Sequence, residues 1–415
     1  MNFYHFIFLL LFFFSSTGQN HDAFILYDSE QLDAVKRNLK SGSASPCAQS
    51  AYQMLLSQAD NLLEIENPTV VDKTIDPPSG DKHDYLSISR YWWPDPEKED
   101  GLPWIRKDGI TNPETQTDAV DRNRLGLMTT GVKYLSLAYY FTEGEQYAQK
   151  AISMLNTWFL VEETRMNPHL EYSQSVPGNL KGRRSGILDG RLITLTIPDA
   201  ISILRHSSHW TQSLENGMKE WFTNYLTWLT ESDLGREGAK QVNNHGSWYR
   251  IHVAVVSLFV GQQSMAEKMI YQARESLEYQ LDDEGRQLHE IERTRSFFYS
   301  CFNLEPLIML AQIGDRLGID LWQYKSVSGK SLPLAVGYLT PVIDGKEWIH
   351  PSKEDNKIVH LIPILYDFHA HFKDENYEQL LEEALTQLST QDVSESEKTG
   401  LLEYCLLDGL DLKFD

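Results

Sequence analysis

The sequence predicts an all-α protein, an (α/α) toroid or incomplete barrel of helical hairpins with long loops that form a cleft. Three observations predict it. Apolar residues recur at spacings of three and four nearly throughout the 415-residue chain, the pattern of amphipathic helices. The helices come in pairs that repeat every ~35 to 50 residues, as in stacked helical hairpins. Sustained strand-like alternation is almost absent.

The hairpins can be followed in order along the chain. The clearest begins with LGLMTTGVKYLSLAYYF at 125–141, is interrupted by TEGE, and resumes with the same period at 145–159. The other predicted pairs are 30–40 with 47–64, 187–204 with 211–230, 245–261 with 264–280, 297–313 with 331–341, and 358–372 with 376–389, before a last helix from 401.

Long inserts without a clear helical period separate some of these pairs, at 66–122, 161–186 and 342–357. Ordered loops on a rigid helical scaffold are where binding and catalysis usually occur. We therefore expect the inserts to build the functional face. A helical scaffold that only binds partners is the alternative.

The N-terminus predicts export. Residues 4–14 are apolar but too few to span a bilayer easily, and Ser16, Thr17 and Gly18 follow, as in a secretory signal peptide. We predict a signal peptide over 1–18, a single domain over 19–415, and a secreted or periplasmic protein. The sequence does not indicate an oligomeric state.

The composition excludes several partner classes. The net charge of -22 opposes binding to nucleic acid or an anionic membrane, both of which need a basic surface. The three cysteines, Cys47, Cys301 and Cys405, are too few and too scattered for a disulfide framework or a zinc knuckle, although one bridge is possible. No metal and no cofactor are predicted.

The first insert is rich in aromatic and basic residues. Arg90, Tyr91, Trp92 and Trp93 lie in a segment with many Pro and Gly residues. Such rings either pin the loop to the helical core or offer flat faces to a sugar. For the two tryptophans taken alone, packing is the more common role.

The second insert combines polar groups with a local basic cluster. Tyr172 and Gln174 can address hydroxyl groups, and the run KGRR at 181–184 includes Arg183. A basic cluster in so acidic a chain suits an anionic ligand. A solvated turn is the alternative.

The stretch NNHGSWY at 243–249 predicts the start of a helix. Asn243 is a suitable N-cap, which places Asn244 and His245 in the first turn, where the helix dipole favours anions. Trp248 follows at a helical spacing. A zinc site of His245 with His252 is unfavourable because seven residues separate them.

A third stretch, ERTRSFFYS at 292–300, contains Arg293, Arg295 and Tyr299. Because Tyr299 lies four residues after Arg295, we expect the Arg295 guanidinium over the phenol ring. A neighbouring cation would lower the pKa of Tyr299. A core tyrosine with a satisfied hydroxyl is the alternative.

The polar side chains of these stretches favour β-elimination over glycoside hydrolysis. Glycoside hydrolysis normally needs two facing carboxylates, for which Asp84, Asp118, Asp121 and Glu171 are the candidates, and no convincing pair is evident. Asn, His, Arg and Tyr instead suit β-elimination from a uronic acid, which needs a neutralised carboxylate, a base and an acid. The alternative that is not an enzyme is a non-catalytic periplasmic oligosaccharide-binding protein.

The motifs KHDYLSISRYWWPDP, NPHLEYSQSVPG, NNHGSWY and ERTRSFFYSCFNLEPL together resemble the alginate lyase superfamily, the α/α-toroid polyuronate lyases of polysaccharide lyase family five and its relatives. The resemblance covers most of the mature chain. It implies an acidic polysaccharide substrate, with mannuronate-rich alginate preferred and glucuronan as the alternative.

The resemblance also implies a catalytic group of Asn244, His245, Arg293 and Tyr299. Asn244, Arg293 and His245 would neutralise the substrate carboxylate, while Tyr299 would move the proton. The interval from Arg293 to Tyr299 is one residue shorter than in the classical members, so Arg295 is a rival for the cationic role.

Overall fold

The computed structural model describes residues 24–178, 187–352, 357–388, 391 and 393–409. The predicted signal peptide at 1–18 and Arg183 lie outside these residues. The helices are α1 (Ser29–Ser41), α2 (Pro46–Leu63), α3 (Arg122–Thr142), α4 (Glu145–Phe159), α5 (Ile187–Thr194), α6 (Ile197–Leu204), α7 (Gln212–Glu231), α8 (Asp233–Ala239), α9 (Asn244–Phe259), α10 (Gln263–Gln280), α11 (Ser296–Leu317), α12 (Leu332–Leu339), α13 (Ile362–Phe372), α14 (Glu375–Leu388) and α15 (Glu395–Leu407).

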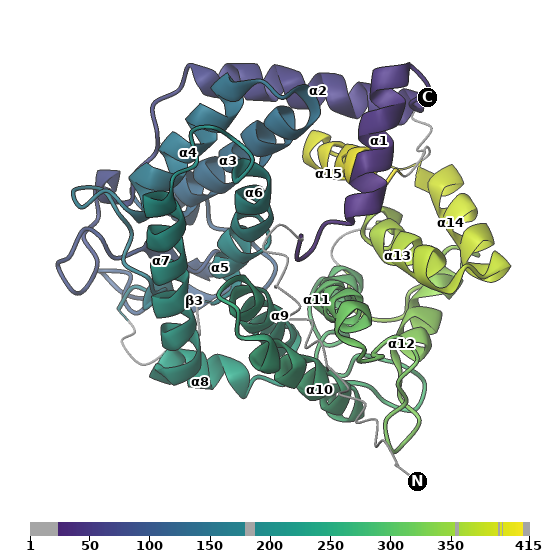
Figure 1. Ribbon diagram of the computed structural model, residues 1–415. Helices are drawn as coiled ribbons and strands as arrows, with labels where there is room; N and C mark the ends of the chain where they lie inside the picture. The colour runs from purple at the N-terminus through teal and green to yellow at the C-terminus, as the bar shows by residue number, and fades with distance from the viewer. Residues whose placement is uncertain (1–23, 179–186, 353–356, 389–390, 392, 410–415) are drawn as a thin grey trace, which may run out of the picture.

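The helices are arranged in a ring, which confirms the predicted α/α toroid. Figure 1 shows α3, α5, α6, α9 and α11 on the inner side, with α4, α7, α10 and α12 outside them. The last helix, α15, packs against α2 and α1, so the first and last helices of the ring meet. In the described part of the chain, no helix has the length and apolar character that crossing a membrane requires.

Inner and outer helices differ in their sequence patterns because they differ in burial. The outer helix α4 buries Ala148, Ala151, Leu155 and Phe159 on one face, at the spacings of an amphipathic helix. The inner helix α9 is packed by α5, α7, α10 and α11 and is buried along nearly its whole length.

The predicted helix over 187–204 is divided in two. Helix α5 ends at Thr194 and α6 begins at Ile197. Pro198 has no backbone N–H to donate to the carbonyl of Thr194, and its ring would clash with that carbonyl in a continuous helix. The other predicted pairs correspond to observed helices.

Short strands join two inserts that were predicted as loops. Strand β1 (Leu86–Ile88) pairs in parallel with β4 (Tyr172–Ser175), and β2 (Trp92–Trp93) pairs antiparallel with β3 (Ile105–Arg106). A buried ion pair supports this region, since Lys73 Nζ lies 3.0 Å from Asp121 Oδ2. Asp121 also accepts the backbone N–H of Leu86 at 2.8 Å.

A disulfide bond closes the ring, and a buried carboxylate anchors the first described residues. A disulfide bond joins Cys47 in α2 to Cys405 in α15 across 358 residues, while Cys301 is free and buried. The buried carboxylate of Asp199 accepts the backbone N–H groups of Ile25 and Leu26, at 2.6 and 2.8 Å. The first described residues are thereby anchored to α6.

Candidate active site

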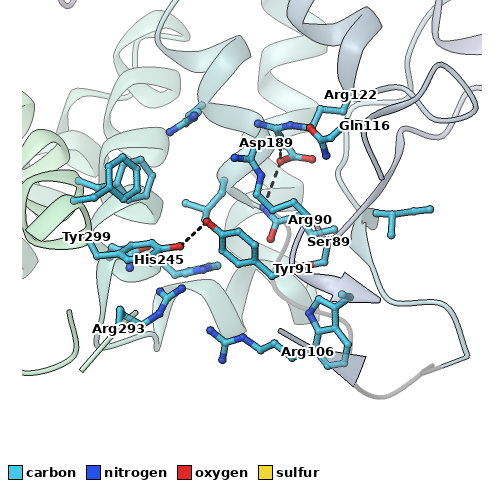
Figure 2. A pocket seen from close by; sticks show the side chains of 18 residues that line it. Ser89, Arg90, Tyr91, Arg106, Gln116, Arg122, Asp189, His245, Arg293 and Tyr299 are labelled. Atoms are coloured by element: carbon cyan, nitrogen blue, oxygen red, sulfur yellow. Dashed lines mark hydrogen bonds and ion pairs between the residues drawn. The ribbon is translucent and has the colours of Figure 1, made fainter. Parts of the chain in front are cut away.

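A cavity of about 130 Å³ lies where the first and second inserts meet the starts of α9 and α11 (Figure 2). Four residues predicted as catalytic line it, together with four predicted to bind substrate. They are Asn244, His245, Arg293 and Tyr299, with Arg90, Tyr91, Trp92 and Gln174. Sequence segments more than a hundred residues apart thus contribute to one site.

The polar start of α9 has the predicted cap. The Asn243 side chain accepts the backbone N–H of His245 at 3.1 Å, so Asn244 and His245 occupy the first turn. Gly246 allows a close approach here, because a Cβ atom at this position would lie 2.0 Å from the carbonyl oxygen of Gln241. His245 is 9% exposed and lines the same cavity as Tyr299 (Figure 2).

The buried carboxylate of Glu290 holds Asn244. Its Oε1 accepts the Asn244 backbone N–H at 2.7 Å, and its Oε2 accepts from Nδ2 of the same residue at 2.8 Å. Burial raises the pKa of Glu290 to about 7, against the opposing effect of these hydrogen bonds. The sequence analysis did not identify Glu290, although this acidic residue lies only two positions before the motif ERTRS.

Arg293, not Arg295, lies over the catalytic candidate tyrosine. The Arg293 guanidinium carbon is 3.7 Å from the centroid of the Tyr299 ring. Arg295 is the N-cap residue of α11, and its guanidinium lies 4.3 Å from the Phe298 ring centroid. The expectation for Arg295 was wrong because it assumed helix already at 295, whereas α11 begins at Ser296.

Asp108 fixes the Arg293 side chain from the first insert. Its carboxylate accepts from Arg293 Nη2 at 2.9 Å and Nε at 3.3 Å, and from the Thr294 hydroxyl at 3.0 Å. It also contacts Arg106. Burial opposes the Asp108 charge, but Arg293, Arg106 and Thr294 outweigh it and hold the pKa of Asp108 well below its usual range.

The pKa of Tyr299 is raised, which corrects the expected lowering. Burial disfavours the phenolate, and this effect exceeds the opposing attraction of Arg293. The Tyr299 hydroxyl also donates to the Tyr91 hydroxyl at 3.1 Å. At neutral pH the resting phenol is therefore protonated.

Asp189 organises the opposite wall of the cavity and was also missed. Its carboxylate accepts from the hydroxyl groups of Tyr85 and Ser173, both at 3.0 Å, and from Nε2 of Gln174 at 3.3 Å. It also pairs with Arg122. Gln174 has φ 49, a strained conformation for a residue other than glycine, which Asp189 helps to hold. Gln116, Arg122 and Arg191 line the same cavity.

Several predicted binding residues lie elsewhere. Trp248 is 1% exposed and packs on Phe302 at 5.0 Å between centroids, so its ring has no free face for a sugar. The spacing that placed it near Asn244 leads inward, into the core. Burial lowers the pKa of His252, also fully buried, to about 3.

Trp93 and Tyr172 belong to the strands rather than to the cavity lining. Trp93 Nε1 donates to the carbonyl of Ile110 at 3.1 Å, with Lys107 Nζ 4.8 Å from the Trp93 ring centroid. Tyr172 pairs with Leu86 across β4 and β1. For Trp93, the packing alternative describes the structure better.

The carboxylates considered for hydrolysis do not line the cavity. Asp84 lies 3.0 Å from Nε2 of His169, and Asp121 is paired with Lys73. Among the described residues, no group of three or more His, Cys, Asp or Glu side chains could hold a metal ion.

Comparisons with known proteins agree on one family. The alginate lyase family profile matches residues 69–349. The crystal structure of an alginate lyase from Bacteroides ovatus is 37% identical with a TM-score of 0.83, covering 91% of this chain and 98% of that chain. No curated protein sequence matches the chain.

More distant structures share the fold. Alginate lyase A1-III from Sphingomonas species A1 is 18% identical with a TM-score of 0.53, covering 83% of this chain and 87% of that chain. A variant of A1-III complexed with a tetrasaccharide is 15% identical with a TM-score of 0.56, covering 87% of this chain and 90% of that chain. Because the family profile spans most of the chain and a 37% identical alginate lyase aligns over nearly all of it, the chain belongs to the alginate lyase family and is a polysaccharide lyase with an acidic polysaccharide as its substrate.

Proposed function

We propose that this lyase cleaves mannuronate-rich, β-1,4-linked alginate by β-elimination in the cavity between α9 and α11, leaving 4,5-unsaturated uronate ends. The observation that carries the proposal is the convergence of Asn244, His245, Arg293 and Tyr299 on that cavity. Arg293 lies directly over the Tyr299 ring there.

In this proposal, Asn244 and Arg293 receive the carboxylate of the sugar that is attacked, with His245 beside them. Elimination begins with loss of the proton at C5, which is acidic only if the growing negative charge on the carboxylate is stabilised. An Asn244 amide held by Glu290 and a guanidinium held by Asp108 can stabilise that charge without reorganising.

Tyr299 would then carry the proton. As phenolate it takes the C5 proton, the C4–O4 bond breaks as the C4=C5 bond forms, and the phenol returns a proton to O4 in a syn elimination. Burial makes the phenolate scarce at rest, so Arg293 is the group that stabilises it when the base is needed. His245 is the alternative base for a C5 proton on the opposite face.

The substrate class is tested with purified polymers. We expect ultraviolet absorbance from the new C4=C5 double bond to rise fastest with polymannuronate, compared with polyguluronate and glucuronan. A faster rise with glucuronan would replace the proposed preference. Tight binding without absorbance on any polymer would identify a non-catalytic oligosaccharide-binding protein.

The proton carrier is tested by Tyr299→Phe. The variant keeps the ring under Arg293 and removes only the hydroxyl, so we expect turnover to fall by roughly 1,000-fold or more while oligosaccharide affinity changes little. Phe298→Tyr would be an unsuitable control, since it adds a phenol near the site. Tyr172→Phe, which removes a hydroxyl outside the cavity lining, is the matched control. A Tyr299→Phe enzyme with near-normal kcat would reject the assignment.

We further propose that residues 1–18 are a signal peptide and that the mature protein is secreted or periplasmic. The disulfide between Cys47 and Cys405 supports an oxidising compartment, where such bonds persist. N-terminal sequencing of the exported protein tests the cleavage site near Gly18.

A further inference from the structure

Glu290 and Asn244 form a contact that the proposed mechanism does not yet use. Glu290 is 1% exposed and lies 46 positions from Asn244 in the sequence. Both of its carboxylate oxygens accept from the same residue, one from the backbone N–H and one from the side-chain Nδ2. The contact thus fixes the main chain and the side chain of Asn244 together.

An ionised carboxylate can only accept hydrogen bonds, whereas a carboxamide has a donor end and an acceptor end. Glu290 therefore decides which end of the Asn244 amide faces it. With the Oδ1 end turned toward Glu290, two acceptors would meet in a buried site, at the cost of an unsatisfied polar group. The Nδ2 group is thereby held toward Glu290, which accepts one of its two hydrogens and leaves the second for the substrate carboxylate.

Burial disfavours the charged form of Glu290 and raises its pKa, while neighbouring groups partly offset this effect. The backbone N–H of Asn244 is at the positive end of the α9 dipole. Arg293 also attracts the Glu290 charge. Above its pKa of about 7, Glu290 is an anion with two oriented donors.

We propose that Glu290 is a positioning residue for the lyase reaction, which sets the orientation of the Asn244 amide and so the polarity that Asn244 presents to the substrate carboxylate. The inference rests on the proposed function and adds a residue to it. Glu290 does not line the cavity, and in this proposal it acts on the substrate through Asn244.

The decisive variant is Glu290→Gln, which keeps the size of the side chain. The backbone N–H of Asn244 cannot turn, so it takes the single acceptor that Gln offers. The Gln NH₂ then faces the Asn244 amide, which must rotate by half a turn and offer its oxygen instead. The contacts between residues 290 and 244 remain satisfied, but the Asn244 oxygen now stands where the second N–H of Nδ2 met the substrate carboxylate, so a donor is replaced by an acceptor.

We expect Glu290→Gln to lower kcat by roughly 100-fold, the size of effect seen when one oriented donor to a developing anion is lost, while KM and the melting temperature change little. Assays at about pH 8 keep wild-type Glu290 ionised. Glu292→Gln is the matched control, because it makes the same change on an exposed residue two positions along, and it should leave kcat unchanged. A Glu290→Gln kcat within about threefold of wild type would overturn the proposal, since a merely structural role survives this substitution.

A double-mutant cycle separates positioning from a general disturbance. In an Asn244→Ala background, Glu290→Gln should lower kcat by less than about threefold, because the amide through which it acts is gone. An equal loss in both backgrounds would show that Glu290 acts by another route, and the proposal would fail.

A further measurement depends on neither the Glu290→Gln variant nor lyase activity. In wild-type protein with ¹⁵N-labelled asparagine, the side-chain signal that disappears in Asn244→Ala should exchange slowly with water and shift as Glu290 titrates. Rapid exchange without a shift would overturn the contact. A wild-type protein without turnover on any polyuronate would instead reject the proposed function and leave this result standing.

Discussion

Arg293 and Arg295 are two positions apart, yet their guanidinium groups lie over different rings. Arg293 covers Tyr299 and Arg295 covers Phe298. The residues themselves were evident in the sequence, and so was their rivalry. Which one faced the phenol depended on where α11 begins, and helix boundaries are decided by tertiary contacts as much as by local sequence.

The first prediction compares these two arginines. Arg293→Ala should lower kcat by roughly 100-fold or more, because a cation aimed at the developing negative charge is lost. Arg295→Ala should lower kcat far less, since Arg295 does not line the cavity. Steady-state kinetics on the preferred polymer distinguish them, with melting temperatures as a check on folding. A larger loss of kcat in Arg295→Ala would return the cationic role to that residue.

At the scale of the elements, what could be predicted depended on sequence distance. Hairpins such as α3 with α4 and α9 with α10 follow from local periodicity and a short connection, and they were predicted. The pairing of β1 with β4 joins Leu86 to Tyr172, and no local pattern links such distant segments. The hydrogen bonds around Asp189 and the contact between Glu290 and Asn244 were missed for the same reason. A single acidic residue in a sequence does not reveal its partner.

Asp108 connects the loop that carries β2 and β3 to the start of α11. It contacts Arg293 and Thr294, and a Cβ atom on the neighbouring Gly109 would lie 2.5 Å from the Thr294 hydroxyl. The loop is thus docked closely at this point. Trp92 and Tyr91, which line the cavity, lie on the same loop segment.

We predict that Asp108→Asn loosens this loop. The amide keeps the size but loses the charge that pairs with Arg293, so KM should rise by roughly tenfold and proteases should cut residues 95–110 faster. Asp100→Asn is the matched control, because Asp100 is exposed and caps only the backbone N–H of Leu102. Unchanged KM and unchanged cleavage in Asp108→Asn would show that the loop is held by other contacts.

At the scale of the whole molecule, the site depends on closure of the ring. The cavity takes residues from β1 and β2, α5, α9 and α11, and neighbouring helices hold these elements in their relative positions. The sequence could indicate helices and their pairing but not which helices meet to close the ring. From the three cysteines, the sequence allowed one disulfide bond but did not identify its two members. The structure shows that the bond joins Cys47 to Cys405.

The last prediction concerns that bridge. It links α2 to α15 across 358 residues, so it restricts the unfolded chain strongly, and its loss should lower the free energy of unfolding by about 2–5 kcal/mol. Replacing Cys47 and Cys405 together by Ser should lower the melting temperature, and a reducing agent should lower that of the wild type to a similar value while leaving the double variant unchanged. Activity well below the melting temperature should persist in both, because neither cysteine lines the cavity. A wild-type melting temperature that is insensitive to reduction would mean that helix packing alone closes the ring. Contacts such as those of Asp108 and Asp189, rather than the covalent link, would then hold the loop segments of the site in place.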